Sequence, residues 1–240
     1  MKYLLFSLLF LSQISQAKVV LIDPGHGGEE SGAVGHLDAK KTRKIFEKDL
    51  SLRLAKKIKD ELSKSTSAYL TRSMDRAVSL QERADLADLV KADLFLSIHF
   101  NSSPNPKSHG FELYYLDNNS GVAANKVERS ENLNLKGEEL MVNQILVDLV
   151  IQQTVHHSKE LAALVYEKVK PVIKLNKIDD RGIKPGLFYV LALSKRPGLL
   201  VEVGFVSNPG ELRKVNEDKF LDSMAKAISA GVMSFINKTK

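Results

Sequence analysis

LLVEVGFVSN, residues 199–208, has the composition of a strand buried in the middle of a sheet. Its first five residues are aliphatic except for Glu202, which stands between Val201 and Val203. Burying a carboxylate among apolar side chains costs several kcal/mol unless a partner charge, a proton or a metal compensates for it. The stretch therefore predicts a central strand and raises the question of what Glu202 faces.

Strand and helix patterns alternate along the rest of the chain. Short apolar runs rich in β-branched and aromatic residues predict strands, and apolar residues that recur every fourth position predict helices. The predicted strands are 18–23, 68–71, 93–99, 111–116, 187–193 and 198–203, and the predicted helices are 48–62, 80–90, 158–169 and 220–236. This alternation predicts the α/β class, with a central, mostly parallel or mixed sheet flanked by helices on both sides.

One segment, at about 118–157, does not follow this rhythm. Residues 122–134 (VAANKVERSENLN) are polar and helix-prone, and residues 140–151 are more apolar and also helix-prone. We expect a helical insertion of one or two helices between neighbouring core elements.

The N-terminus differs in composition from the rest. Lys2 precedes an apolar run at 3–11, and the small residues Ser15 and Ala17 suit a cleavage site. The run is too short to span a bilayer, so residues 1–17 are expected to be a secretory signal peptide rather than a membrane anchor or a buried helix. Residues 18–240 contain no linker and are expected to form one exported domain, soluble outside the cytoplasm.

Composition limits the chemistry. The chain has no cysteine, so any metal must be held by histidine and carboxylate side chains. The net charge of +6 suits an anionic envelope polymer, but basic residues on solvated helical faces are the better explanation of it. Basic and aromatic residues are not interleaved as in nucleic-acid-binding proteins, and no nucleic-acid partner is expected.

Four polar residues are expected near the carboxyl ends of strands, where functional groups gather in open α/β sheets. His26 follows the first strand in a glycine-rich turn, His99 ends the strand 93–99, Glu47 stands at the start of a helix, and Glu202 lies near the end of the last strand. Singly, such residues also serve as helix caps or hydrogen-bonded core residues. Together, two imidazoles and one carboxylate form a His₂Glu zinc set with an open position, and the remaining carboxylate can accept a proton from the zinc-activated water.

Six ordered blocks resemble a known family. They are DPGHGGEESGAVG, EKDLSLRLA, LTRSMDRAVSLQERADLAD, ADLFLSIHFNSS, GFELYYL and LLVEVGFVSNPGEL. The blocks resemble those of the zinc-dependent N-acetylmuramoyl-L-alanine amidases of the LytC/AmiC type, the amidase_3 family, from residue 19 to about 236 apart from the insertion.

The resemblance implies that His26, Glu47 and His99 bind Zn²⁺ and that Glu202 is the catalytic glutamate. The implied substrate is peptidoglycan, cleaved between the lactyl group of N-acetylmuramic acid and L-alanine of the stem peptide during wall remodelling or daughter-cell separation. The implied location is the periplasm, with secretion to the cell wall as the alternative.

The insertion also resembles a family feature. Some division amidases carry a helix there that covers the active site, with a glutamate reaching the zinc until an activator protein displaces it. Glu131 is the leading candidate for this glutamate, followed by Glu128, Glu138 and Glu139. The alternative is a solvated helical flap, because acidic residues are common in any such helix.

Other residues in the blocks have weaker assignments. Arg72, Asp75 and Arg83 are expected to form an ion-paired turn that supports the site, and Asn101 to orient a ligand or contact substrate. The remaining histidines, His36, His109, His156 and His157, are expected on the surface.

Three other functions stay open from the residues alone. The same metal set would serve a zinc peptidase or a deacetylase. An inactive wall-binding module would not need all four site residues. An autoinhibited enzyme that mainly reports to a division complex is the third possibility.

Overall fold

The computed structural model describes residues 18–38, 40–119, 131 and 138–239, with the backbone alone at 138–143. The predicted signal peptide, 1–17, lies outside the described residues. Among the described helices, none combines the length and the apolar composition that crossing a membrane requires.

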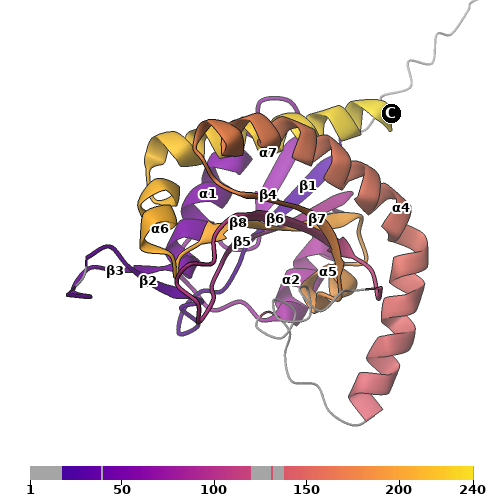
Figure 1. Ribbon diagram of the computed structural model, residues 1–240. Coiled ribbons are helices and arrows are strands. Elements are labelled where there is room, and N and C mark those ends of the chain that lie inside the picture. The colour runs from indigo at the N-terminus through magenta and orange to yellow at the C-terminus, as the bar shows by residue number, and fades with distance from the viewer. Residues whose placement is uncertain (1–17, 39, 120–130, 132–137, 240) are drawn as a thin grey trace, which may run out of the picture.

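A six-stranded sheet forms the centre of the molecule (Figure 1). Its strand order is β4 (Ser67–Leu70), β1 (Val19–Pro24), β5 (Leu94–Asn101), β8 (Gly198–Phe205), β6 (Phe111–Leu116) and β7 (Asp180–Gly186). The first four strands run parallel to one another, β6 is antiparallel to β8, and β7 is parallel to β6. The predicted α/β class and mixed sheet are confirmed.

Helices cover both faces of this sheet (Figure 1). Three of them, α1 (Glu47–Leu62), α4 (Glu138–Leu175) and α7 (Asp218–Lys238), pack together over one face. The other face carries α2 (Leu80–Leu89) and α5 (Tyr189–Ser194). The short helix α6 (Pro209–Val215) follows β8, and a two-stranded hairpin, β2 (Val34–His36) and β3 (Lys44–Phe46), projects from the side.

Alternation along the central strands decides which side chains reach the site. In β5, Leu96 and Ile98 join the core beneath α1 and α7, whereas Phe95 joins the core beneath α5. Successive side chains of a strand point to opposite faces. The second face therefore carries buried polar side chains near the carboxyl ends of β1, β5 and β8, namely Asp23, Ser97, His99, Asn101 and Glu202.

Two parts of the predicted topology need correction. The predicted strand 187–193 is wrong, because most of it belongs to the helix α5, whose side chains are nearly all buried and show no helical alternation. The sixth strand is instead β7, which has the sequence DRGIKPG and, within the described part of the chain, lies at the sheet edge and pairs with β6 alone. An edge position tolerates Pro185, which has no N–H to donate to a neighbour.

The predicted insertion contains much of a single long helix. Residues 140–151 and 158–169, predicted as separate helices, both belong to α4. Residues 120–130 and 132–137 of the insertion lie outside the described part of the chain.

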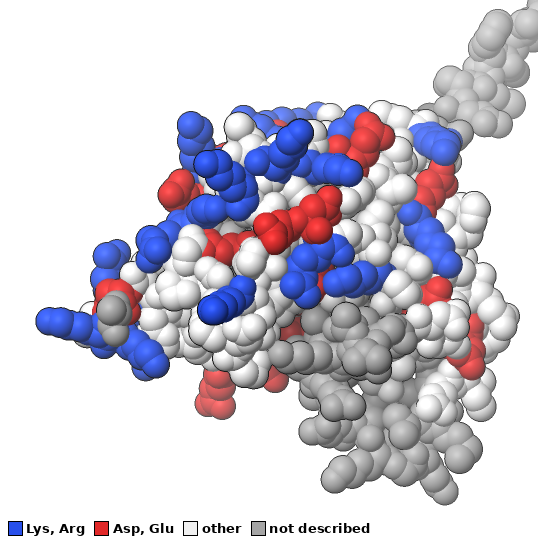
Figure 2. Space-filling model, in the orientation of Figure 1, with Lys and Arg blue, Asp and Glu red and all other residues white. Residues whose placement is uncertain are grey.

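Basic side chains are spread over the molecular surface. Figure 2 shows them interspersed with acidic side chains across the face seen in Figure 1. Four of them, Lys40, Lys41, Arg43 and Lys44, are exposed on the β2–β3 hairpin. The surface thus mixes both signs of charge, as solvated faces do.

Candidate metal centre

Two buried arginines donate hydrogen bonds to the backbone at the end of β1 and in the loop that follows it. Arg72 donates from Nε to the carbonyl of Pro24 at 3.1 Å and from Nη2 to the carbonyl of Gly25 at 2.7 Å. Arg83 donates from Nη2 to the carbonyl of His26 at 3.1 Å. His26 has a φ of 58°, in the left-handed region that non-glycine residues seldom adopt, so these contacts fix an unusual backbone.

The expected ion-paired turn is organised differently from the prediction. Arg83 pairs with Asp23 at the end of β1, whereas Asp75 accepts from Lys48 Nζ at 2.6 Å. Arg72 donates to the backbone carbonyls of Pro24 and Gly25 and forms no ion pair with Asp75 or Asp23. All these side chains support the site, but the three named in the prediction do not pair with one another.

Glu47 is the first residue of α1, yet its carboxylate is directed away from the amides of its own helix. Oε2 accepts from the backbone N–H of Ala33 at 2.8 Å, and Oε1 accepts from that of Phe100 at 3.0 Å. The N-cap residue of α1 is Phe46, which makes no side-chain cap. The helix-cap interpretation of Glu47 is therefore not what the structure shows.

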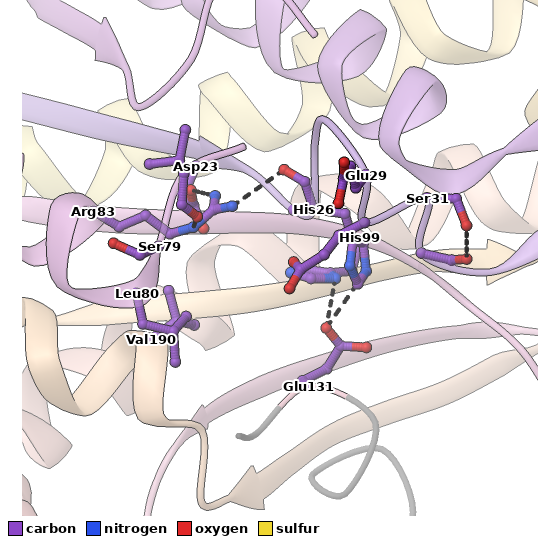
Figure 3. A pocket seen from close by; sticks show the side chains of 14 residues that line it. Asp23, His26, Glu29, Ser31, Ser79, Leu80, Arg83, His99, Glu131 and Val190 are labelled. Atoms are coloured by element: carbon purple, nitrogen blue, oxygen red, sulfur yellow. Dashed lines mark hydrogen bonds and ion pairs between the residues drawn. The ribbon is translucent and has the colours of Figure 1, made fainter. Parts of the chain in front are cut away.

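Four side chains from distant parts of the sequence converge here, and Figure 3 shows three of them, His26, His99 and Glu131. Glu47 Oε1 lies 3.2 Å from His26 Nε2 and 3.1 Å from His99 Nδ1. Figure 3 shows Glu131 facing the two histidines, and its Oε2 lies 3.0 Å from His99 Nδ1 and 3.7 Å from His26 Nε2. One ligand atom of each residue lies within 4.8 Å of the other three, so the cluster has the dimensions of a metal site.

The charges of the cluster perturb one another strongly. Burial would raise the pKa of Glu47, but His26 and His99 hold that pKa far below its usual range. Burial would lower the pKa of His99, but the carboxylates of Glu131 and Glu47 hold it well above its usual range. The described protein thus concentrates two carboxylates and two imidazoles in a buried space, an arrangement that a cation stabilises.

Glu202 is buried beside this cluster. In the sheet register it lies opposite His99 on β5 and Glu112 on β6. Burial raises the pKa of Glu202 well above its usual range, against the opposing charge of His99, and the carboxylates of Glu131 and Glu47 add to the shift. Glu202 thus has apolar neighbours in the sequence because β8 is a buried strand, and its own side chain lies beside the polar cluster at the end of that strand.

The residues present fit a zinc ion. Two buried side-chain atoms, His26 Nε2 and Glu202 Oε2, make no well-aligned hydrogen bond within the described part of the chain, although His26 Nε2 lies 3.2 Å from Glu47 Oε1. Buried polar atoms are rarely left without a hydrogen bond, so both atoms suit a site that binds a further group. Imidazole nitrogens with carboxylate oxygens are a donor set that Zn²⁺ accepts in catalytic sites.

A cavity of about 550 Å³ opens in front of the two histidines (Figure 3). Glu29 and Ser31 line one side of it, and Ser79, Leu80 and Val190 line the other. Substrate therefore has room to approach the cluster from the loop side of the sheet.

Asn101 lies within a second buried polar group. Its Nδ2 donates to Glu112 Oε2 at 2.9 Å, and its Oδ1 accepts from the backbone N–H of Ser102 at 2.7 Å. Glu112 also pairs with Arg181 and, at 2.8 Å, with Lys184 Nζ. Glu112 is not among the predicted site residues, although a glutamate inside the apolar run FELYYL is a signal of the same kind as Glu202.

The remaining predicted residues fall into two groups. His109, His156 and His157 are exposed and His36 is half-buried, which agrees with the prediction of surface positions. Of the alternatives to Glu131, Glu128 lies outside the described residues, and Glu138 and Glu139 begin α4, where only the backbone is described.

The chain is similar to known proteins along most of its length. The family described as N-acetylmuramoyl-L-alanine amidase, Amidase_3, matches residues 20–234. The amidase AmiA of Escherichia coli (strain K12) is 34% identical over 230 residues, which cover 92% of this chain and 76% of AmiA. LytC of Bacillus subtilis (strain 168) is 33% identical over 220 residues, which cover 91% of this chain and 35% of LytC.

Solved structures show the same relationship. The crystal structure of N-acetylmuramoyl-L-alanine amidase from Clostridium difficile 630 superposes with a TM-score of 0.70 at 32% identity, covering 94% of this chain and all of that one. Fold and site together define an amidase catalytic domain of the α/β class with a histidine and carboxylate cluster that could hold a metal ion. The chain belongs to the Amidase_3 family and is an N-acetylmuramoyl-L-alanine amidase that acts on peptidoglycan.

Proposed function

We propose that this amidase is zinc-dependent, that His26, Glu47 and His99 hold the zinc ion, and that Glu202 carries the proton during hydrolysis. The convergence of three ligand atoms from a loop, a helix and a strand within 4.8 Å carries this proposal. The bond cleaved is the amide between the lactyl group of N-acetylmuramic acid and L-alanine of the stem peptide.

The chemistry needs water, a base and an acid. A bound zinc ion supplies Lewis-acid polarisation of the scissile carbonyl and of the attacking water. Glu202 accepts a proton from that water while the oxygen of the water bonds to the carbonyl carbon. Glu202 then returns the proton to the alanine nitrogen as the C–N bond breaks, which leaves a lactyl carboxylate and a free amine.

The metal set alone would serve a peptidase or a deacetylase equally well. Family membership favours the amide between sugar and peptide, because the match covers nearly all of the described fold. The complete set of His26, Glu47, His99 and Glu202 argues against a wall-binding module, since a binder has no use for a proton carrier.

Mass spectrometry of digested peptidoglycan tests the reaction. We expect intact glycan strands and released peptides that begin with the free amine of L-alanine, with His99→Ala as the inactive control. Released peptides that retain muramic acid, or cuts within the stem peptide, would contradict the proposal.

We further propose that residues 1–17 are a signal peptide, that residues 18–240 are the amidase domain, and that the protein acts in the periplasm or, alternatively, in the cell wall. The basic n-region, the apolar run and the location of peptidoglycan outside the cytoplasm support this. N-terminal sequencing of the exported protein should start near Lys18. A start at Met1 would contradict the cleavage.

Glu131 supports a proposal of autoinhibition. Its Oε2 lies 3.0 Å from His99 Nδ1 and 3.7 Å from His26 Nε2, within reach of the open position that a His₂Glu site would have. A carboxylate there competes with the nucleophilic water. The enzyme would be relieved by an activator protein that binds the open state better, because only differential affinity shifts such an equilibrium.

Glu131→Ala tests the autoinhibition. If the closed state outnumbers the open state by about 99 to 1, the variant gains up to about 100-fold in basal activity on purified wall. Zinc content should stay unchanged, and Glu167→Ala, an exposed glutamate of α4, is the matched control. If Glu131→Ala has wild-type activity with its fold and zinc content intact, autoinhibition is contradicted and the insertion is a solvated helical flap.

A further inference from the structure

Asp23, at the end of β1, is buried and almost fully hydrogen-bonded. Its Oδ1 accepts from Thr71 Oγ1 at 2.6 Å and pairs with the guanidinium of Arg83. Its Oδ2 accepts from Ser97 Oγ at 2.9 Å. An ionised carboxylate beside a guanidinium has no hydrogen to give, so every contact of Asp23 is one in which it accepts.

This fixes the direction of the Ser97 hydroxyl. A serine hydroxyl has a single hydrogen, and here that hydrogen points to Asp23. The Ser97 oxygen therefore turns only lone pairs toward His99 Nε2, which lies 3.2 Å away. A contact of this kind forms only if Nε2 carries a hydrogen and donates it.

When the ring is neutral, the opposite nitrogen, Nδ1, is then the one with a lone pair, whereas a protonated ring carries hydrogen on both nitrogens. His99 Nδ1 faces Glu47 Oε1 at 3.1 Å and Glu131 Oε2 at 3.0 Å. In the neutral ring with hydrogen on Nε2, Nδ1 is an acceptor that faces two carboxylate oxygens. Three acceptors that converge in this way are stable only around a positive charge.

We propose that Asp23 and Ser97 are positioning residues that set the tautomer of His99, so that Nδ1 is presented to the metal. This rests on the proposed function, in which His99 is a zinc ligand. We call this chain of contacts, from Asp23 through Ser97 to His99 Nε2, the relay. It acts on Nδ1 through the imidazole ring, because Asp23 does not contact Nδ1 itself. Partners of this kind affect metal affinity by about 10- to 100-fold in known metal sites.

Asp23→Asn reverses the relay. Thr71 and Arg83 are donors, so the amide oxygen of asparagine must face them, and the amide nitrogen must face Ser97. Ser97 Oγ then accepts from the amide and gives its own hydrogen to His99 Nε2. His99 is pushed toward the tautomer with hydrogen on Nδ1, the wrong one for ligation.

Two companion variants separate this effect from a general loss of packing. Ser97→Ala removes the relay and keeps the pairing of Asp23 with Arg83, so it remains informative if Asp23→Asn does not fold. Thr71→Val removes a hydrogen bond from the same carboxylate but leaves the direction of the Ser97 to His99 contact unchanged, and is the matched control.

The experiment uses the full chain labelled with ¹⁵N at histidine. Zinc affinity is measured by chelator competition, and the His99 ring is followed by NMR, identified by its absence in His99→Ala. We expect about 10- to 100-fold weaker zinc binding in Asp23→Asn and Ser97→Ala, and near-wild-type binding in Thr71→Val. In the zinc-free neutral ring, Asp23→Asn should move the hydrogen from Nε2 toward Nδ1.

Two results would overturn the relay: wild-type zinc affinity with unchanged ring signals in Asp23→Asn and Ser97→Ala, or an equal loss of affinity in Thr71→Val. Zinc binding retained in His99→Ala is a different failure, because it removes His99 from the proposed metal site altogether.

Discussion

Gly25→Ala should destroy the metal site with little effect on the fold. A Cβ at this position would lie 2.3 Å from His99 Cε1 and 2.7 Å from His99 Nδ1. The nearest ring atom falls about 1.1 Å short of the 3.4 Å at which ordinary van der Waals contact begins. Either the loop or the imidazole must therefore move by that amount.

The loop is the less movable of the two. The N–H of Gly25 donates to the carbonyl of Ile98 at 3.0 Å, and its carbonyl accepts from Arg72 Nη2 at 2.7 Å and from Ser51 Oγ at 3.0 Å. The ring of His99 has to yield. Metal ligands tolerate errors of only about 0.2 Å, so a shift of about 1 Å removes His99 from the ligand set.

The expected result is a folded protein with little zinc. Overpacking of this kind costs about 1–3 kcal/mol, which most domains, stable by about 5–15 kcal/mol, survive. Zinc affinity should fall by at least about 10- to 100-fold, and hydrolysis with it. Chelator competition and thermal unfolding measure the two effects on the same preparation.

Gly210→Ala is the matched control. Among the described residues, and apart from its chain neighbours and the backbone of its own helix, the added Cβ has one atom within 4 Å, Asn208 Oδ1 at 3.2 Å. Its zinc affinity should equal that of the wild type. Wild-type zinc affinity in Gly25→Ala would refute the reasoning, because the ring would then have found room that the structure does not contain.

Two further predictions concern the proton carrier and acid stability. Glu202→Ala should retain about one bound zinc and lose hydrolysis, whereas His99→Ala should lose both the zinc and hydrolysis. Metal analysis and a dye-release assay on the same preparations measure the two properties. Zinc lost in Glu202→Ala but retained in His99→Ala would contradict the assigned roles. Burial would raise the pKa of Glu112, but Lys184, Tyr114 and Arg181 hold it below its usual range. The stability that Glu112 contributes is therefore present above the unfolded pKa of about 4.3 and lost as pH falls through the folded pKa. Urea unfolding of Glu112→Gln at about pH 6 and about pH 3 should show a smaller difference than in the wild type, and an unchanged difference would contradict this.

The sequence determined most of the sheet and the helices that flank it. Leu50, Leu54, Ile58 and Leu62 recur every fourth residue, and all four are buried on the inner face of α1. The run FELYYL matches β6 residue for residue. These signals are local, because a periodic apolar face must be buried wherever the element lies.

Tertiary structure decided the elements without such a signal. The α5 segment is apolar on all sides, and a fully buried short run has the same composition as a helix or as a strand. In β7, glycine, proline and charged residues suggest a turn, and the segment is a strand only because β6 offers an edge to pair with. Neither the helix α5 nor the strand β7 follows from the periodicity of its own sequence.

The site divides in the same way. The sequence placed His26, Glu47, His99 and Glu202 near element ends, because strand direction and residue type are local properties. Which atoms meet is a property of the folded chain. The choice of Nδ1 over Nε2 in His99 depends on Ser97, on Asp23 beyond it and on Glu47, which reaches the ring from a helix 52 residues earlier in the chain.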